Sequence, residues 1–451
     1  MNKPQLNEIF TLTIHAIGSS GEGVGRLDGY TVFVDGALPG ECVSVRLIEA
    51  HKNYGRGELI SIIEPSPDRV EAPCHLFGVC GGCQIMHLSY EKQLKIKQQR
   101  VMDALQRIGK ITDIEVPPCL PSPSPLGYRN KIQLPVKNNV EGLAFGLFAR
   151  GSHQLVEVES CHIHCEMGDK VYREVSTLIK KAGILAYNPE TGSGELRHLL
   201  IKSAIYTQQA LVVLVTANGN SEKLIPLAKQ IMEHSPQVKG VVQAVNKQKG
   251  NRILGESFKV LSGTGHIHEA LGDLLFKVSP ASFFQVNPEQ ALLLYAKALE
   301  FADLEGTETL LDAYCGVGTL SLFFAKHVKR VFGVECVPEA IEDAKENAAL
   351  NKIGNVSFVC ANAEAYISSL AAIDVAILNP PRKGCDLILL KELKRLRPKT
   401  IVYISCDPST LARDLSHLRD FGYRIEAIQP FDMFPQTAHV ECVVKLNFGS
   451  N

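Results

Sequence analysis

Long apolar runs, net charge and repeats are all scarce in this sequence. No apolar run approaches the roughly 20 residues that a membrane-spanning helix requires, and the N-terminus lacks the basic and apolar regions of an export signal. The formal net charge is −1, so the total charge gives no sign of nucleic-acid binding. Internal repeats and low-complexity tracts are absent as well. We therefore expect a soluble protein of the cytoplasm that has no membrane partner.

Disulfide bonds are not expected either, although the chain contains 13 cysteines. An odd number of cysteines, spread over 451 residues without an export signal, is typical of metal binding or thiol chemistry. Hydrophobic residues make up 45% of the chain and charged residues 21%, which predicts a folded protein with a core. At this length we expect two or three domains, in a monomer without an obligate protein partner.

Two segments are strongly basic despite the neutral total. Residues 91–110 contain six Lys or Arg against two acids, and residues 382–399 contain seven against two. Such clusters can bind phosphates. A charged run can equally be the solvated face of a helix, so both interpretations stay open on charge alone.

Residues 1–63 are predicted to form a small β-barrel of the oligonucleotide-binding (OB) type. Phe10, Leu12 and Ile14 alternate with threonines, as in a half-buried strand, and a glycine-rich turn follows. Short strands are then expected around 32–34, 43–45 and 58–63. The segment resembles a TRAM domain, a barrel attached to RNA-modifying enzymes. Its five basic and seven acidic side chains add no support for RNA binding.

The remainder is predicted to form two α/β domains. In residues 64–277, short apolar runs alternate with turns, which indicates a mixed α/β central domain with an antiparallel sheet. In residues 278–451, strand, glycine turn and helix follow one another repeatedly, the signature of a doubly wound parallel sheet. The predicted fold class is therefore α/β, with a Rossmann-like C-terminal domain after the central domain and the barrel.

Three cysteines near the start of the central domain form a candidate metal site. Cys74, Cys80 and Cys83 follow a C-x5-C-x2-C spacing, with glycines between them that allow tight backbone turns. The fourth ligand is either Cys161 or Cys165. Four thiolates suit zinc or an iron–sulfur cluster, and three clustered cysteines with one distant cysteine fit the cluster better. Unligated, buried thiols are the alternative.

A nucleotide-type pocket is predicted at the carboxyl edge of the C-terminal sheet. Gly316 and Gly318 follow an expected strand and let a ligand approach the backbone. Glu335 ends the next strand, where a carboxylate can accept hydrogen bonds from ribose hydroxyls. Asn362 follows a third strand and is expected near an adenine. The third glycine of the dinucleotide fingerprint is missing, which disfavours a dinucleotide.

Asn379 follows the fourth expected strand, in Asn-Pro-Pro-Arg. Two prolines hold the backbone in an extended turn, which directs polar groups toward whatever lies beside the reactive carbon of a cofactor. A purely structural turn is the alternative.

The best candidate nucleophile is Cys406. An apolar strand runs directly into Ser-Cys-Asp-Pro, which places Cys406 at the same edge of the sheet as the cofactor loops. Glu441 begins another apolar strand, and a carboxylate at such a boundary can have a raised pKa that suits a base. The structural alternatives are that Cys406 is a buried core cysteine and that Glu441 is a charge on an edge strand.

Together, these motifs resemble those of bacterial RNA (uracil-5-)-methyltransferases, most closely the 23S ribosomal RNA members that carry a TRAM domain and a [4Fe-4S] cluster. The resemblance covers nearly the whole chain. It rests on the barrel, the C-x5-C-x2-C segment, Ser-Phe-Phe-Gln-Val-Asn at 282–287, Asp-x-Tyr-Cys-Gly-x-Gly at 312–318, Asn-Pro-Pro-Arg at 379–382, Ser-Cys-Asp-Pro at 405–408 and His-Val-Glu at 439–441.

The resemblance implies methylation of carbon 5 of a uridine in 23S ribosomal RNA, with S-adenosylmethionine as the methyl donor in a class I methyltransferase domain. It implies Cys406 as the nucleophile that adds to carbon 6 and Glu441 as the acceptor of the carbon 5 proton. Phe283 and Phe284 would stack on a splayed-out base. The remaining implied roles are the fourth cluster ligand, Cys161, and contacts to donor or uracil from Gln285, Tyr314, Glu335 and Asn379.

Asn379 departs from the family, which has Asp at this position. An amide keeps hydrogen bonding but offers a donor in place of a charge. One alternative is therefore an inactive methyltransferase domain in a cluster-bearing RNA-binding protein. A second is methylation of transfer RNA, whose enzymes generally lack the barrel and the cysteines. A third, a cytosine-5 methyltransferase, would need Pro-Cys where this chain has Pro-Pro-Arg, with Cys385 only later.

Overall fold

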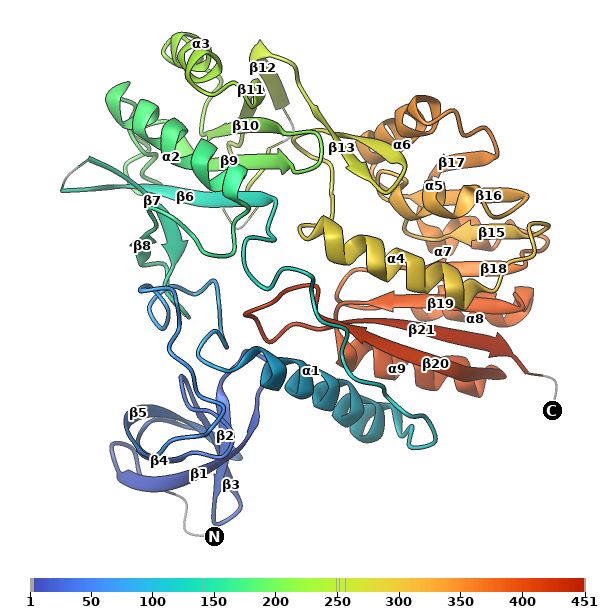
Figure 1. The fold of residues 1–451 in the computed structure, drawn as a ribbon, viewed down its shortest axis with the longest axis horizontal. Coiled ribbons are helices and arrows are strands. Elements are labelled where there is room, and N and C mark those ends of the chain that lie inside the picture. The colour runs from blue at the N-terminus through green and yellow to red at the C-terminus, as the bar shows by residue number, and fades with distance from the viewer. Residues whose placement is uncertain (1–3, 141, 249, 251, 256, 450–451) are drawn as a thin grey trace.

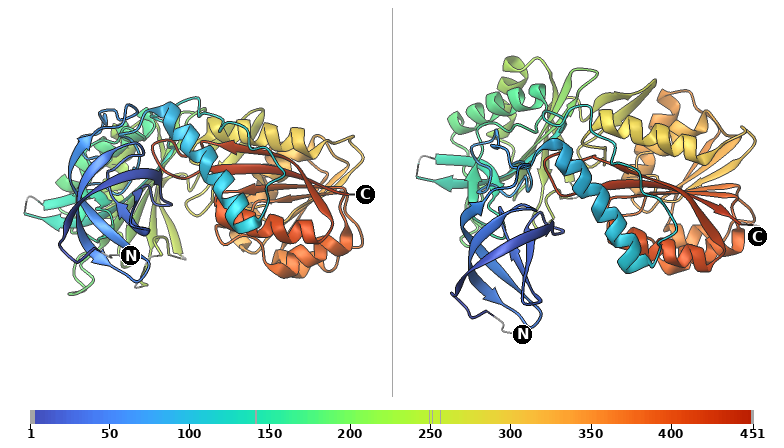
Figure 2. Two further views of the ribbon diagram at one scale, coloured as in Figure 1. Left: turned by 90° about the horizontal axis from the view of Figure 1, so that it is seen from below. Right: turned by 60° about the horizontal axis from the view of Figure 1, so that its bottom comes forward.

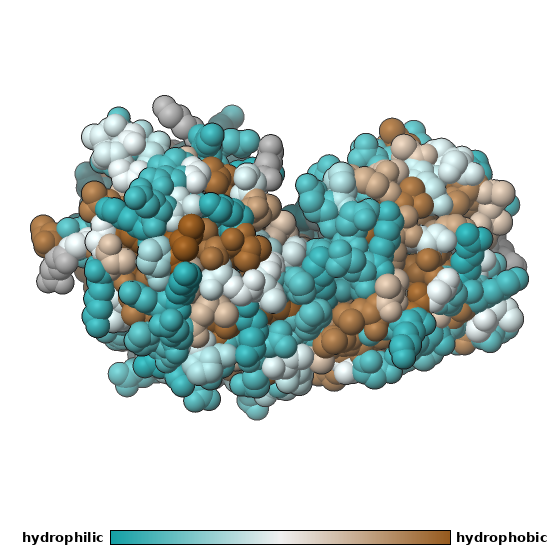
Figure 3. Space-filling view, turned by 90° about the horizontal axis from the view of Figure 1, so that it is seen from above, coloured by the Kyte–Doolittle hydropathy of each residue, from teal (hydrophilic) through white to brown (hydrophobic). Residues whose placement is uncertain are grey.

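The computed structural model describes residues 4–140, 142–248, 250, 252–255 and 257–449. A central lobe carries the N-terminal barrel at one end and faces a C-terminal lobe across the molecule (Figures 1 and 2). Figure 3 shows a recess between the two lobes when the molecule is seen from above. No helix in the described part of the chain is long and apolar enough to cross a membrane.

The N-terminal segment forms the predicted barrel. It is closed, with strand order β1-β2-β3-β5-β4. Leu12 and Ile14 of the alternating segment are buried inside it. The barrel needs a glycine at Gly57, because a Cβ there would lie 2.2 Å from Cγ1 of Val45. The strands are β1 (Ile9–Ile17), β2 (Gly23–Leu27), β3 (Tyr30–Val34), β4 (Cys42–Ala50) and β5 (Tyr54–Glu64).

The central lobe is built on a seven-stranded mixed sheet of order β12-β11-β10-β9-β6-β7-β8. Only β10 and β11 pair in parallel among its described strands. Helices α2 (Glu166–Lys181) and α3 (Leu224–His234) pack against one face of it. Its strands are β6 (Lys131–Asn139), β7 (Gly142–Phe148), β8 (Leu155–Glu157), β9 (Leu196–Ala204), β10 (Gln209–Thr216), β11 (Val238–Val245) and β12 (Ser257–Gly263).

The C-terminal lobe contains a second seven-stranded sheet, of order β17-β16-β15-β18-β19-β21-β20. The sequence predicts a parallel sheet, and the pairs from β17 to β19 are parallel. Strand β21 differs, because the loop 432–440 returns it antiparallel to both β20 and β19. The strands are β15 (Thr309–Asp312), β16 (Arg330–Glu335), β17 (Val356–Cys360), β18 (Val375–Leu378), β19 (Thr400–Ser405), β20 (Tyr423–Phe431) and β21 (Glu441–Phe448).

Helices cover both faces of this sheet, as in a doubly wound fold. The face covered by α4 to α6 shares its core with the hairpin β13–β14 and with the second face of the central sheet. The opposite face is covered by α7 to α9 and by the N-terminal helix α1 with its π-helical turn η1. The elements are α1 (Tyr90–Ala104), η1 (Leu105–Gly109), β13 (Ile267–Leu271), β14 (Leu274–Val278), α4 (Pro288–Ala302), α5 (Thr319–Ala325), α6 (Pro338–Leu350), α7 (Ala363–Ile367), α8 (Leu387–Leu396) and α9 (Pro408–Asp420).

Candidate active site

Cys406 lies at the carboxyl end of β19, where the chain turns into α9. Asp407 caps this helix, and its Oδ1 accepts hydrogen bonds from the backbone N–H groups of Ser409 and Thr410 at 2.9 and 3.0 Å. Pro408 occupies the first helical position. The motif Ser-Cys-Asp-Pro is thus a strand end followed by a helix cap, and half-buried Cys406 is the residue between them.

Glu441 lies beside Cys406 because β21 runs antiparallel to β19. The last paired residues of this ladder are Ser405 and Cys442, so the next residue on each strand belongs to the same end of the sheet. Glu441 is 4% exposed, and this burial raises the pKa of its carboxyl from 4.5 to about 7. A carboxylate with that pKa can accept a proton near neutral pH.

The charges around Cys406 act on its thiol in opposite directions. Burial and the negative charge of Glu441 raise the pKa of the Cys406 thiol, whereas the guanidinium of Arg382 lowers it. The net shift is upward, so the thiol is protonated at neutral pH in the free protein. Formation of the thiolate therefore requires a proton acceptor or a change of the surrounding charges.

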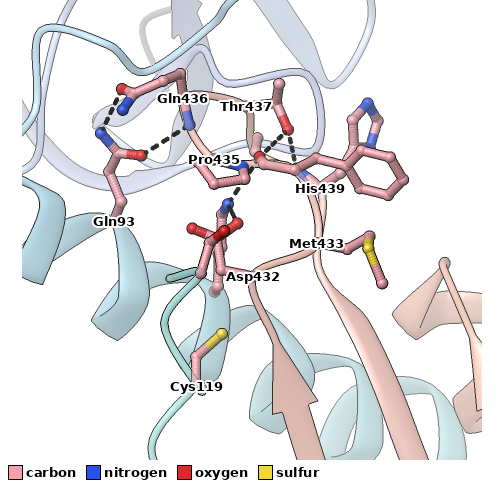
Figure 4. A network of polar contacts seen from close by, with 12 residues as sticks. Gln93, Cys119, Asp432, Met433, Pro435, Gln436, Thr437 and His439 are labelled. Atoms are coloured by element: carbon pink, nitrogen blue, oxygen red, sulfur yellow. Dashed lines mark hydrogen bonds and ion pairs between the residues drawn. The ribbon is translucent and has the colours of Figure 1, made fainter. Parts of the chain in front are cut away.

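The loop 432–440, which leads into β21, is held by α1 (Figure 4). Gln93 Nε2 donates to Gln436 Oε1 at 3.0 Å, and the Gln436 backbone N–H donates to Gln93 Oε1 at 3.1 Å. Lys97 forms a buried ion pair with Asp432 and donates to the carbonyl of Phe434 at 3.1 Å. Among the described residues this loop belongs to no strand, and its backbone is hydrogen-bonded by these side chains and by the backbone of residues 84, 85 and 120.

This arrangement decides between the two interpretations of the basic segments for several side chains. Lys97 is completely buried, and Arg100 donates to the carbonyl of Ala438, so both are engaged inside the protein and not with phosphate. In the second segment, Arg395 donates to backbone carbonyls. Arg382 is exposed at the end of the sheet that carries Cys406 and Glu441, which we call the catalytic edge. Of these four basic side chains, Arg382 is the one that is exposed at this edge, where Cys406 lies.

The residues expected to bind a cofactor lie at the same edge of the sheet. Strands β15 to β18 end side by side, which brings Gly316, Glu335, Asn362 and Asn379 to this edge. Gly316 has a φ of 53°, and an added Cβ would meet nothing within 4 Å. Open space therefore faces this part of the backbone. Glu335 and Asn379 are half-buried, and Asn362 is exposed.

The second glycine of the motif has a different role. Gly318 has a φ of 83° and begins α5, where a Cβ would approach the ring of Phe358 at 2.8 Å. Below this turn, Asp312 is fully buried and accepts a hydrogen bond from the Ser321 hydroxyl at 2.7 Å. Burial raises the pKa of Asp312 to about 6, although hydrogen bonds from Ser321 and from the backbone of Tyr314 oppose the shift.

The segment 282–287 contains one correction to the sequence-based expectations. Phe283 is 68% exposed, as a base-stacking residue must be. Phe284 is buried in the core and packs against Phe276, with ring centroids 6.0 Å apart, so it is not available to a base. The alternation of a short extended segment sends neighbouring side chains to opposite sides, which explains the difference. Gln285 is buried beside this core.

Tyr295 of α4, which is not among the residues expected from the sequence, is 1% exposed. Its hydroxyl lies 3.3 Å from that of Thr319. Burial raises the pKa of Tyr295 to about 12, so it stays neutral. The charge of Glu441 also raises the pKa of Tyr295, and a hydrogen bond with Gln285 lowers it. The sequence could not predict this position, because a tyrosine on the apolar face of a helix has the same pattern as any core residue. Tyr314, in contrast, was expected, and its hydroxyl donates to Glu364 at 3.4 Å.

The cysteines expected to hold a metal line one cavity of about 480 Å³. Burial, followed by the neighbouring Cys161 and Cys80, raises the pKa of the Cys83 thiol to about 12. Cys165 is buried elsewhere and lines a different cavity. Of the two candidates for a fourth ligand, the structure therefore brings only Cys161 to the other three. No disulfide is formed among the 13 cysteines, all of which the structure describes.

The donor set of this cavity fits a soft metal centre in its chemistry. No three His, Cys, Asp or Glu side chains in the described ranges are already arranged as metal ligands. The four thiols nevertheless face one space, and no acidic residue lines it. Although burial opposes the shift, the hydrogen bond and positive charge of His164 lower the pKa of the Cys161 thiol, which favours the thiolate that a metal binds.

The same cavity reaches the catalytic edge. Arg382 and His439 line it together with the exposed ring of Phe283. Its polar lining is cationic or neutral, with Arg129 and Lys131 on the central lobe. The cysteines and the catalytic edge thus face one positively charged cavity between the two lobes.

Two family models match this chain. The model of the tRNA (uracil-5-)-methyltransferases matches residues 89–448, and the TRAM-domain model matches residues 4–60. An uncharacterized RNA methyltransferase of Halalkalibacterium halodurans is 46% identical over 445 residues, which are 98% of this chain and 97% of the relative. An uncharacterized RNA methyltransferase of Clostridium tetani is 43% identical over 446 residues, with the same coverage of both chains.

A solved structure extends the likeness to three dimensions. The Pyrococcus abyssi tRNA (uracil-54, C5)-methyltransferase in complex with S-adenosyl-L-homocysteine is 30% identical to this chain, with a TM-score of 0.77. The match covers 97% of this chain and 100% of that one. The barrel and both lobes therefore have counterparts in a solved structure.

Proposed function

Because the chain belongs to the tRNA (uracil-5-)-methyltransferase family, we propose that it methylates carbon 5 of a specific uridine in 23S ribosomal RNA through a covalent cysteine–uracil intermediate. The observation that carries this proposal is the adjacency of Cys406, at the end of β19, to Glu441, at the start of the antiparallel β21. A thiol nucleophile and a carboxylate with a pKa of about 7 are the two groups that the reaction requires.

The proposed reaction begins at carbon 6, because carbon 5 of uracil is a weak nucleophile. The Cys406 thiolate forms a bond to carbon 6, and the electrons of the 5,6 double bond move toward carbon 5 and the carbonyl at carbon 4. S-adenosylmethionine, when bound, supplies the electrophilic methyl group that carbon 5 attacks. Glu441 accepts the proton that leaves carbon 5, the double bond re-forms, and the sulfur of Cys406 leaves as a thiolate. Arg382 favours the thiolate before and after these steps, since its charge lowers the pKa of Cys406.

The methyl donor is proposed to bind at the edge formed by β15 to β18. The open space at Gly316 supports this placement. Asn379 keeps a hydrogen-bonding amide where the family has a carboxylate, so contact is retained with a different charge. The residues proposed to contact the donor or the uracil are Gln285, Tyr314, Gly316, Gly318, Glu335, Asn362 and Asn379.

We also propose that Cys74, Cys80, Cys83 and Cys161 hold a [4Fe-4S] cluster. Their common cavity and all-sulfur donor set support this assignment. A bound cluster would join the segment 74–83 to residue 161, which makes its contribution structural or RNA-contacting. The corresponding domain division is a barrel over 1–63, a central domain over 64–277 and a methyltransferase domain over 278–451.

Transfer RNA is the second candidate substrate. The archaeal tRNA enzyme covers nearly all of this chain, barrel included, so the barrel does not separate the two RNA classes. The cysteine set is the remaining argument for ribosomal RNA. Mapping 5-methyluridine in the ribosomal and transfer RNA of a deletion strain distinguishes them, because only the true substrate loses its methyl group.

The chemistry itself is tested by trapping. RNA that contains 5-fluorouridine has no proton to release from carbon 5, so the enzyme and S-adenosylmethionine should form an adduct that survives a denaturing gel. Absence of an adduct in the wild type would contradict the enzymatic proposal. An adduct that persists in Cys406→Ala would contradict the assignment of the nucleophile.

A further inference from the structure

We call the cavity of about 480 Å³ that reaches the catalytic edge the catalytic cavity. A second cavity, of about 400 Å³, lies on the central lobe. It is formed by the end of β6, the end of β7, the start of β9 and the loop that follows residue 186. Its side chains include Lys137, Phe148, Tyr187, Arg197 and His198. Nothing in the proposed chemistry uses these residues.

Strand β6 connects the two cavities. Side chains alternate along a strand, so residues 131, 133, 135 and 137 share one face. Lys131 and Gln133 line the catalytic cavity, whereas Pro135 and Lys137 line the second one. Six residues at about 3.3 Å each place the far end of this row roughly 20 Å from its start.

Strand β7 borders both cavities but adds no second row of side chains. Leu147 lines the catalytic cavity and Phe148 lines the second, and as neighbours in a strand their side chains point to opposite faces. The Gly81 backbone N–H donates to the carbonyl of Phe148 at 3.1 Å, which ties this strand end to the cysteine segment. The two cavities are therefore neighbouring parts of one track over the central sheet.

The second cavity combines aromatic rings with cations. The Lys137 ammonium lies 5.5 Å from the ring centroid of Phe148, and the Arg197 guanidinium lies 5.4 Å from that of Tyr187. Each cation also donates to backbone carbonyls, Lys137 to His153 at 2.6 Å and Arg197 to residues 246 and 248 at 2.7 and 2.8 Å. An ammonium has three N–H donors and a guanidinium has five, so donors are left for a phosphate. Both rings are half-buried. Glu190 is the single acidic residue in its lining. Rings that stack on bases, next to cations that contact phosphates, are the elements of single-stranded nucleic-acid binding.

We propose that this cavity binds a single-stranded nucleotide that flanks the target uridine on the same RNA. Its base stacks on Tyr187 or Phe148, and the adjoining phosphates contact Lys137 and Arg197. The target uridine meanwhile occupies the catalytic cavity beside Phe283 and Arg382, and β6 carries the intervening strand. This inference rests on the proposed RNA substrate.

The test compares a trinucleotide of uridine with a dodecanucleotide of uridine, each fluorescein-labelled, in polarisation titrations of the full-length protein. The trinucleotide is too short to occupy both cavities, and the dodecanucleotide can span them. Tyr187→Ala should weaken dodecanucleotide binding roughly 10-fold, as expected for the loss of one base-stacking contact. It should weaken trinucleotide binding less, because the trinucleotide can bind in the catalytic cavity instead. Lys137→Ala should lower the salt dependence of dodecanucleotide binding by about one phosphate contact.

Phe258→Ala is the matched control, because Phe258 is a partly exposed ring on β12 at the other edge of the same sheet. It should bind both oligonucleotides as the wild type does. Unchanged dodecanucleotide affinity in Tyr187→Ala and Lys137→Ala would overturn the proposal, and so would an equal loss for both lengths. Failure of the proposed function is separate: it appears as a missing adduct with 5-fluorouridine RNA in the wild type, whatever the polarisation titrations show.

Discussion

Lys97 and Asp432 form an ion pair whose two side chains have no exposed surface, although 335 residues separate them in the sequence. Burial lowers the pKa of Lys97 and raises that of Asp432, and the charge of each partner opposes the shift of the other. The pair joins α1 to the loop before Glu441. The helix between the barrel and the central lobe is therefore part of the support of the catalytic edge.

Removal of one member of this pair should be strongly destabilising. Lys97→Met leaves Asp432 buried without its cation, and we expect a loss of about 3 to 5 kcal/mol in the free energy of unfolding. Urea denaturation measures this value. The double variant Lys97→Met, Asp432→Leu should recover much of the loss, because both charges are then removed. Arg107→Ala, which breaks the exposed pair with Asp103, is the control and should cost at most about 1 kcal/mol. A double variant as unstable as the single one would contradict this account.

Glu441→Gln should separate the two halves of the proposed reaction. The variant can form the bond between Cys406 and carbon 6 but cannot take the carbon 5 proton, so turnover should fall by roughly 10² to 10⁴ while an adduct accumulates with ordinary RNA. In the wild type, the rate should fall as the pH drops below about 7, because Glu441 becomes protonated. Steady-state rates across pH and denaturing gels check both points. Full turnover in Glu441→Gln would exclude it as the base.

The same substitution should increase stability in a defined pH window. The pKa of Glu441 is raised from 4.5 to about 7 in the folded protein, so burial of its charge costs nothing below pH 4.5 and costs progressively more up to pH 7. Relative to the wild type, Glu441→Gln should therefore gain up to about 3 kcal/mol across this window and keep the gain at higher pH. Urea denaturation at pH 4.5 and pH 8 measures the difference. A constant difference between the two pH values would be incompatible with the raised pKa.

The cysteine assignment predicts different results for half-buried Cys80 and buried Cys165. Protein purified without oxygen should be brown, and Cys80→Ser should bleach it and lower its iron content. Cys165→Ser should leave the colour unchanged, because Cys165 lies outside the cavity of the other four. Iron analysis and the visible absorption spectrum provide the readout. Stoichiometric zinc without iron would refute the cluster.

Much of the C-terminal lobe could be predicted because its signals are local. Glycine turns, prolines and capping residues act within a few positions of the chain, so Gly316, Asn379 and Cys406 could be placed at strand ends from the sequence. The closed barrel was predicted for the same reason, from alternation and turns. The direction of β21 could not be predicted, since an apolar strand has the same pattern in either orientation.

The sequence pattern could not decide the role of residues whose type suits two different environments. Lys97 and Arg100 belong to a basic run that is typical of a solvated or phosphate-binding face, but they are engaged with the loop 432–440. Phe284 was expected to stack on a base and is instead in the core, next to exposed Phe283. Charge and hydrophobicity describe a side chain, whereas its partner depends on segments hundreds of residues away.

The amino-acid sequence by itself determined the order of the elements, the chemistry available at Cys406 and the thiols near the start of the central domain, because these depend on residue type and short-range geometry. Only the tertiary structure decided that Glu441 lies next to Cys406. It also decided that Cys161, and not Cys165, lines the cavity of the other three cysteines, and that two cavities lie next to each other along β6. Those relationships arise from strand direction and from the packing of the two lobes, which bring together groups that no local pattern connects.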